Sequence, residues 1–184
     1  MLNPWDLPKT AVIDGKSYDL HTDFRDILQI ICWLEREDLP VFIRWQVALG
    51  LFYEGSVPEA SMPEAMEYLA DFIRWGQENG TPGPKLLDWQ LDADLIIADV
   101  NKAAGTELRA MPYVHWWTFL GWFRAIGPGQ LSTLVSVREA VQKGRKLEGW
   151  QKDYLKENRR RVLMAKPLTQ DERQEKQRLE ALLQ

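Results

Sequence analysis

Residues 115–123 have the sequence His-Trp-Trp-Thr-Phe-Leu-Gly-Trp-Phe, the most aromatic stretch of the chain. Pro112 suits the start of a helix that contains it, and Gly127-Pro128-Gly129 ends that helix near Ile126. Apolar side chains fall on every side of the helix, so no face of it suits water. A helix of this kind lies at the centre of a protein and is covered by its neighbours. We therefore expect a mainly α-helical fold built around residues 112–126.

Further helices are predicted on both sides of this centre from apolar residues that recur at helical spacing. Thr22 is expected to cap the first of them, Ser61 with Glu64 fits a capping box for the third, and Gly105 stops the fourth. The second is expected to turn Val41, Trp45, Ala48, Leu49 and Phe52 inward. The predicted helices span about 23–36, 40–53, 61–75, 86–104, 131–142 and 147–163, with one more from Thr169 to Leu183. Residues 76–84 are glycine- and proline-rich and predict a loop.

A β-hairpin is predicted ahead of the helices. Asp14-Gly15 separates two short runs with strand character, residues 10–13 and 16–20, and this dipeptide suits a type I′ turn. A lone two-stranded ribbon is marginal in water, so it should lie against helices. The prediction is an irregular bundle of six to eight helices with a short N-terminal hairpin at about residues 10–20. Residues 1–163 form one helical domain in this prediction, and residues 164–184 form a charged, basic helical tail.

Composition narrows the class of protein. Cys32 is the only cysteine among 184 residues, which excludes an internal disulfide framework and a multi-cysteine zinc site within one chain. The longest uncharged run, Ala110 to Phe123, is too short to span a membrane as a helix. The N-terminus has neither the basic region nor the apolar stretch of a signal peptide. We expect a soluble, reduced, intracellular protein.

The charge is unevenly divided along the chain. Residues 1–137 carry 10 basic and 19 acidic side chains, a net of −9, whereas residues 138–184 carry 13 basic and 8 acidic ones, a net of +5. Arg159-Arg160-Arg161 is the obvious place for nucleic acid to bind. Acidic side chains alternate with the basic ones in this region, however, and that pattern favours a solvated or protein-binding helix.

Candidate catalytic groups each have a simpler structural explanation. Asp88, Asp92, Asp94 and Asp99 could ligate a hard cation or act as acid and base, but acidic residues near a helix N-terminus usually face solvent. His115 could be a general base, but a packed histidine whose ring N–H bonds to the backbone is favoured. Phosphate-binding glycine motifs and a nucleophile elbow are absent from the sequence. We therefore expect no enzyme activity, no metal and no cofactor.

The tryptophans divide into two groups. Trp116, Trp117 and Trp122 are expected in the core, whereas Trp5, Trp75 and Trp89 lie near helix ends or loops, where core and interface roles are equally favoured. Accessible aromatic and methionine side chains predict a groove that binds an amphipathic helix. The basic tail is predicted to bind an acidic segment of the partner. The predicted partner-binding residues are Trp5, Met62, Met66, Trp75, Trp89, Arg159, Arg160 and Arg161.

Several stretches resemble one bacteriophage family. They are the run from Asp92 to Val100 leading to His115-Trp116-Trp117-Thr118-Phe119, and the opening Ile13-Asp14-Gly15-Lys16 followed by Thr22-Asp23-Phe24-Arg25. Over about Ala11 to Lys156 the chain is similar to the family known as gene product fifteen. Val100 stands where the resemblance implies an aromatic residue, and the segment from Leu168 to Gln184 is divergent.

The resemblance implies a role in building siphophage tails. Members of the family are encoded between the tail-tube and tape-measure genes, and by that position they look like tail assembly chaperones that coat the tape-measure protein. No catalytic or cofactor residues are assigned in the family. We expect a protein that binds the tape-measure protein and other tail assembly proteins, with self-association as a further property, in the host cytoplasm and absent from the mature virion. Membrane and nucleic-acid partners are not expected. The alternative is a structural or connector protein of the virion tail that oligomerises through its aromatic surface.

Overall fold

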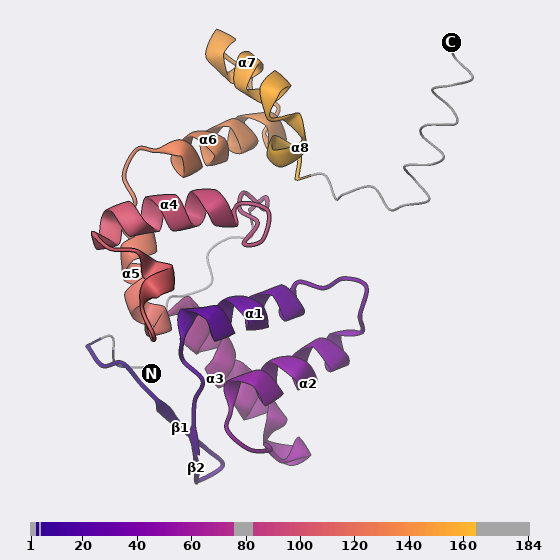
Figure 1. Cartoon of the computed structure of the whole chain (residues 1–184). Helices are drawn as coiled ribbons and strands as arrows, with labels where there is room; N and C mark the ends of the chain where they lie inside the picture. Colours follow the sequence, from indigo (N-terminus) through magenta and orange to yellow (C-terminus); the bar gives the residue numbers. More distant parts are fainter. Residues whose placement is uncertain (1–2, 4, 76–82, 165–184) are drawn as a thin grey trace, which may run out of the picture. The chain divides into compact units, whose positions relative to one another are not determined.

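The computed structural model describes residue 3, residues 5–75 and residues 83–164 (Figure 1). The chain divides into two compact units, residues 1–133 and residues 134–184. In the described ranges the backbone forms helices and one two-stranded antiparallel sheet, so the predicted mainly α fold with an N-terminal hairpin is confirmed. The helix expected from Thr169 to Leu183 and the greater part of the loop expected at residues 76–84 lie outside the described residues. No helix among the described residues has the length and apolar character needed to cross a membrane.

The elements follow the chain in a simple order. The first unit contains β1 (Thr10–Ile13), β2 (Lys16–Asp19), α1 (Phe24–Leu34), α2 (Val41–Phe52), the 3₁₀ turn η1 (Glu59–Ser61), α3 (Met62–Arg74), α4 (Ala93–Ala104), the 3₁₀ turn η2 (Leu108–Ala110) and α5 (Trp116–Arg124). Helix α6 (Gln130–Gln142) spans the boundary between the units. The second unit continues with α7 (Gly149–Glu157) and α8 (Arg159–Val162).

The hairpin has the predicted register and turn. Thr10 pairs with Asp19 and Ile13 with Lys16, while Asp14 and Gly15 have φ angles of 50° and 72°, the positive values that a type I′ turn requires. Its turn is held by α3, because the Ser61 hydroxyl donates to Asp14 Oδ2 at 3.2 Å and Glu64 Oε2 accepts from Asp14 N at 3.0 Å. The hairpin therefore lies against helices, as expected for a two-stranded ribbon.

The capping box predicted from Ser61 and Glu64 is wrong for the same reason. Ser61 makes no side-chain cap hydrogen bond, and its backbone (φ −96°, ψ −1°) already belongs to the turn η1. A capping residue needs extended backbone so that its side chain can reach the first amides of the helix. Both polar side chains are instead used to fasten the hairpin turn.

Helix α1 begins one residue later than predicted. Asp23, not Thr22, is its cap: Asp23 has extended backbone (φ −63°, ψ 140°) and accepts a hydrogen bond from Arg25 N at 3.0 Å. The hydroxyl of Thr22 lies 2.7 Å from that of Tyr113 instead. The hydrogen bond between Thr22 and Tyr113, which are far apart in the sequence, therefore replaces the helix cap that was predicted for Thr22.

Helix α2 runs beside α1 and buries a narrower face than predicted (Figure 1). Ala48, Leu49 and Phe52 are buried as expected, but Val41 is 58% exposed. Apolar residues occupy nearly every position of α2, so their spacing does not select one face. The first turn of the helix consequently leaves apolar side chains in contact with solvent.

Helices α4 and α5 both start later than predicted. Asp88 Oδ1 accepts hydrogen bonds from Gln90 N and Leu91 N, which holds residues 89–92 in turns rather than in a helix, and α4 begins only at Ala93. Helix α5 begins at Trp116, because the backbone of its cap residue His115 is extended and pairs with another part of the chain.

The predicted seventh helix, residues 147–163, is interrupted at Asn158. The backbone of Asn158 departs from helical geometry (φ −113°, ψ 26°), and its side-chain amide donates to Tyr154 O at 3.1 Å. This local hydrogen bond competes with the helical one and separates α7 from α8.

In the second unit the fully buried Arg138 donates from Nη2 to Arg161 O, the backbone carbonyl near the end of α8, at 2.7 Å.

Helix α5 is central to the first unit, as the sequence predicts. Trp116 and Trp117 are each 1% exposed, and their indole N–H groups donate to Ile73 O and Phe72 O, both at 2.9 Å. These bonds satisfy the last carbonyls of α3 and fix α5 across its end. Trp122 is half-buried, so the prediction that it belongs to the core is only partly met.

Candidate functional site

Helices α1 and α5 start from one shared piece of backbone pairing. Phe24 N donates to Val114 O at 2.9 Å, and Trp116 N donates to Thr22 O at 2.8 Å, which makes an antiparallel bridge centred on Asp23 and His115. Each central residue is also the cap of its own helix, because its extended backbone leaves its side chain free to reach the first turn. The two helix N-termini are therefore locked side by side.

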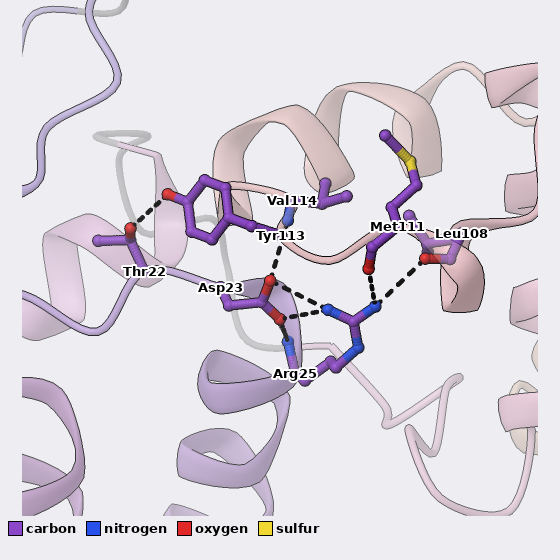
Figure 2. A network of polar contacts seen from close by, with 7 residues as sticks. All are labelled: Thr22, Asp23, Arg25, Leu108, Met111, Tyr113 and Val114. Atoms are coloured by element: carbon purple, nitrogen blue, oxygen red, sulfur yellow. Dashed lines mark hydrogen bonds and ion pairs between the residues drawn. The ribbon is translucent and has the colours of Figure 1, made fainter.

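Asp23 and Arg25 extend this bridge into a polar network (Figure 2). The carboxylate of Asp23 accepts from Val114 N at 2.9 Å and from both its own helix and the guanidinium of Arg25, with Arg25 Nη1 at 3.0 and 3.1 Å from the two oxygens. Arg25 Nη2 then donates to Met111 O at 2.7 Å and to Leu108 O at 3.3 Å. We call Thr22, Asp23, Arg25, Tyr113, Val114 and His115 the α1–α5 clasp. It fastens the turn η2 to the first helix.

The ring of His115 is packed and neutral. Its Nδ1 accepts from Trp117 N at 3.1 Å, so the ring proton is assigned to Nε2, which donates to Pro8 O at 3.1 Å. His115 is 2% exposed, and this burial lowers its pKa below the ordinary value, with the nearby charge of Lys9 acting in the same direction and the bond to Pro8 opposing it. The expectation of a packed histidine bonded to backbone is confirmed.

The carboxylates of the α4 region are structural acceptors. Asp92 is fully buried and accepts from Asp88 N at 2.9 Å, so the prediction that it faces solvent is wrong. Asp99 Oδ2 accepts from Leu131 N at 3.0 Å, and its carboxylate lies against Gly129 at the start of α6. Asp94 is exposed, as expected. In the described part of the chain, no three His, Cys, Asp or Glu side chains gather closely enough to hold a metal ion.

Hydrogen bonds outweigh desolvation at Asp88. Burial alone would raise the pKa of its carboxyl, but the N–H groups of Leu91 and Gln90 and the ammonium of Lys85 together lower it below the ordinary value. A carboxylate that caps a turn in this way stays ionised. It is a fixed negative charge next to Trp89.

The predicted partner-binding aromatics have different surroundings. Trp5 is 92% exposed. Trp75 ends α3 in left-handed geometry (φ 57°), and its ring lies between Trp117, at 5.9 Å between ring centroids, and the guanidinium of Arg124, at 4.9 Å. Trp89 is half-buried, with its ring 5.2 Å from that of Phe123. Trp75 therefore acts largely in packing, whereas Trp89 is only partly covered.

The remaining predicted residues do not join these aromatics in one groove. Met62 lines a pocket of about 180 Å³ beside Leu49 and Val57, and Met66 lies half-buried one turn further along α3. Trp89 lines a different and larger groove. Arg159, Arg160 and Arg161 form most of α8 in the second unit, where Arg159 and Arg160 are exposed.

The larger groove has a volume of about 770 Å³ and extends along α1. We call it the α1 groove; its lining residues are Leu28, Gln29, Cys32, Trp33, Arg36, Trp89, Gln90 and Ala93. The pKa of the Cys32 thiol is raised first by burial and then by the charges of Glu35 and Asp88, so the thiol is protonated. Sequence reasoning missed Leu28, Cys32 and Trp33 as lining residues. An available signal was the apolar arc of α1, which is too wide for one buried face.

A second apolar surface lies at the first turn of α2. Val41 and Phe42 are each 58% exposed and Ile43 is 38% exposed, in consecutive positions. We call these three residues the α2 patch. Apolar side chains that gather on a surface in this way commonly mark a place where another molecule binds.

Comparison with models of known protein families shows to which family the chain is related. A sequence model of the bacteriophage Gp15 proteins matches residues 5–164. The chain belongs to this family. The match covers most of the chain and extends past both ends of the predicted range of resemblance, from Ala11 to Lys156. Comparisons of this Gp15-family protein with curated proteins and with solved structures found no match.

The motifs that carried the resemblance meet in the structure of this Gp15-family protein. Thr22-Asp23-Phe24-Arg25 provides one side of the α1–α5 clasp, and His115-Trp116-Trp117 provides the other side and the centre of the core. The acidic run before them supplies Asp92 and Asp99 as buried or capping acceptors. Val100, where the resemblance implies an aromatic residue, is fully buried in α4, so that difference affects packing.

Proposed function

We propose that this phage protein is a tail assembly chaperone that binds the tape-measure protein in the host cytoplasm and is absent from the mature virion. Membership of the Gp15 family supports a phage role. The observation that carries the finer proposal is the α1 groove, an accessible apolar surface held open on a well-packed unit. A chaperone for long apolar helices needs such a surface, because it must cover them without unfolding itself.

The proposal involves binding alone, without a catalytic step or a cofactor. The side chains that could act as acids or bases already have structural roles in the fold: His115 caps α5, and Asp92 and Asp99 accept hydrogen bonds from backbone N–H groups. The groove, by contrast, joins apolar side chains of α1 to Trp89 without belonging to the core.

Co-expression with the tape-measure protein of the same phage tests the proposal. We expect the two proteins to purify as one complex and the tape-measure protein to become insoluble when expressed alone. Mass spectrometry of finished virions should detect the tape-measure protein but not this chain. Two proteins that separate on a sizing column at low micromolar concentration would contradict the proposal.

A connector role in the virion tail is the second candidate, and the α2 patch favours it. Val41 and Phe42 are more than half exposed, and Trp5 is 92% exposed, so ordered copies of the chain have apolar surface with which to associate. Detection of the chain in stoichiometric amounts in purified virions would support this role against the chaperone.

A further inference from the structure

We propose that the α1 groove binds an amphipathic helix of the partner whose apolar stripe is flanked by basic side chains. This inference rests on the proposed function, because it specifies which kind of tape-measure segment the groove accepts. Its basis is the length, the lining and the charge of the groove.

The groove has the length of one apolar stripe. Its lining residues on α1 run from Leu28 to Trp33, five steps or about 8 Å along the helix axis, and Arg36 follows just beyond the end of that helix. A guest helix that presents side chains at i, i+3, i+4 and i+7 spans seven steps, or about 11 Å. Two turns of a partner helix are therefore long enough to cover the α1 lining and to reach Arg36.

The aromatic wall formed by Trp89 is fixed before a partner arrives. Trp89 contacts Trp116, Phe119 and Phe123, with ring centroids 6.2, 6.3 and 5.2 Å away. The ring of Trp33, which also lines the groove, lies 4.9 Å from the guanidinium of Arg36. Side chains that are already ordered lose little conformational entropy on binding, which favours affinity.

Two basic side chains beside the groove have acidic partners. Arg36 pairs with Asp38 at 2.6 Å, and Lys85 lies 2.8 Å from Glu35 and 3.4 Å from Asp88. Glu37, which follows Arg36, and Asp94, which follows Ala93, are exposed and add further negative charge. The guanidinium of Arg44, which donates to Leu34 O at 2.9 Å, is a third cation, so five carboxylates against three cations leave this surrounding with a net charge of −2.

The negative charge extends into the groove itself. Burial has the largest effect on the pKa of the Cys32 thiol and raises it; Glu35 and Asp88 raise it further, while a hydrogen bond with Gln90 and the charge of Lys85 act in the opposite direction with smaller effect. A thiol that lines the groove therefore experiences the field of these two carboxylates. Lysine or arginine side chains beside the apolar stripe of a guest helix would be attracted by the same field, whereas acidic ones would be repelled.

Cys32 supplies a direct measurement, since it is the only cysteine of the chain and lines the groove. The probe is a designed helical peptide with leucine at i, i+3, i+4 and i+7 and lysine at the polar positions; its control has glutamate in place of lysine. We expect the lysine peptide, at about ten times its Kd, to slow alkylation of Cys32 by a maleimide about tenfold. The glutamate peptide should leave the rate unchanged.

Two matched variants test the place of binding. Ala93→Arg adds bulk and positive charge to the groove, whereas Ala98→Arg adds the same side chain at an exposed position of α4 outside the lining. We expect Ala93→Arg to weaken binding of the lysine peptide at least about tenfold and Ala98→Arg to change it by less than about twofold. Circular dichroism of both variants checks that they remain folded.

Three results would overturn the inference. They are unchanged Cys32 alkylation with the lysine peptide, equal affinities of the two variants, and alkylation that slows with rising protein concentration in the absence of peptide, which would place a second copy in the groove. The tape-measure protein separates this failure from that of the proposed function. If wild type does not bind it, the proposed function fails; if Ala93→Arg binds it as well as wild type, only the present inference fails.

Discussion

Asp23 and His115 are each used by two parts of the fold at once. Asp23 accepts one hydrogen bond from its own helix and one from Val114 N, and His115 connects Trp117 N to Pro8 O through the two nitrogens of its ring. A substitution at either position therefore removes a helix cap and a contact between distant segments together. Substitutions at these positions are expected to lower the free energy of unfolding more than the substitution of an ordinary cap residue does.

The first prediction concerns Asp23→Ala. This change leaves Arg25 N and Val114 N without their acceptor and separates the Arg25 guanidinium from its carboxylate. We expect the free energy of unfolding to fall by about 2–3 kcal/mol, measured by urea denaturation. The control is Asp94→Ala at an exposed position of α4, which should cost less than about 1 kcal/mol. Equal losses in the two variants would show that the contacts of Asp23 stabilise the fold no more than those of an exposed carboxylate near a helix N-terminus.

The second prediction concerns pH. The pKa of His115 is lower in the folded chain than its ordinary value of 6.5, so the unfolded chain binds more protons as pH falls. The contribution of His115 to stability is therefore complete above pH 6.5 and is lost as pH falls below that value toward the folded-state pKa. Protonation of Nδ1 would also remove the acceptor for Trp117 N.

The variant His115→Asn isolates this effect. Its side-chain oxygen can accept from Trp117 N as Nδ1 does, but it does not titrate. We expect the variant to be less stable at neutral pH, since the bond to Pro8 is lost, and to show a smaller fall in Tm than wild type between about pH 7.5 and about pH 5.5. Parallel falls in the two proteins would assign the pH dependence to other groups.

At the scale of elements, α6 depends on a residue of another helix. The carboxylate of Asp99, from α4, accepts from Leu131 N in the first turn of α6. It approaches so closely that a Cβ on Gly129 would lie 2.8 Å from its oxygens. Glycine at this position is what permits the contact between the two segments.

The third prediction follows from this approach. Gly129→Ala should push the carboxylate away and lower the free energy of unfolding by about 1–2 kcal/mol, the value of a lost helix cap. The matched variant is Gly50→Ala in the interior of α2, where nothing lies within 4 Å of the added Cβ, and it should stabilise by about 0.5–1 kcal/mol. Changes of Tm in the same direction for both variants would contradict this account.

The elements were largely predictable because their signals are local. Asp14-Gly15 identified the hairpin turn, Gly105 ended α4, and the apolar run at residues 115–123 identified the central helix. The starts of helices were predicted less well. Thr22 and Ser61 had the right chemistry for caps, but both form hydrogen bonds with residues far along the chain, which no local pattern reveals.

The candidate site was harder to predict than the fold. Trp89 was recognised as a residue for an interface, but its neighbours Leu28 and Cys32 come from α1, more than fifty residues earlier. Their meeting depends on residues 89–92 forming turns instead of the first turn of a longer helix. The turns at residues 89–92 are held by hydrogen bonds to Asp88, and these compete with the backbone hydrogen bonds that would extend α4 toward its N-terminus. The sequence pattern alone does not select between the turns and the longer helix.

For the molecule as a whole, the α2 patch is the surface through which we expect copies of the chain to associate. The fourth prediction is that Phe42→Ser reduces self-association in sedimentation velocity while changing stability by less than about 0.5 kcal/mol, because Phe42 is already 58% exposed. Glu59→Ser, at an exposed position of η1 that also changes one surface residue to serine, is the control. Unchanged association in Phe42→Ser would remove the structural support for a connector role.

The α1–α5 clasp also determines the order in which the chain can fold during synthesis. Thr22 and Tyr113 are separated by 91 residues, so the first helix cannot be closed at its N-terminus until α5 has left the ribosome. The end of α3 must wait as well, because the carbonyls of Phe72 and Ile73 receive their donors from Trp117 and Trp116. Until then a nascent chain of α1 to α3 displays the apolar surface around Phe24 and Phe72, which α5 later covers. The interval between the synthesis of residues 75 and 124 is therefore when this protein itself is most exposed to aggregation.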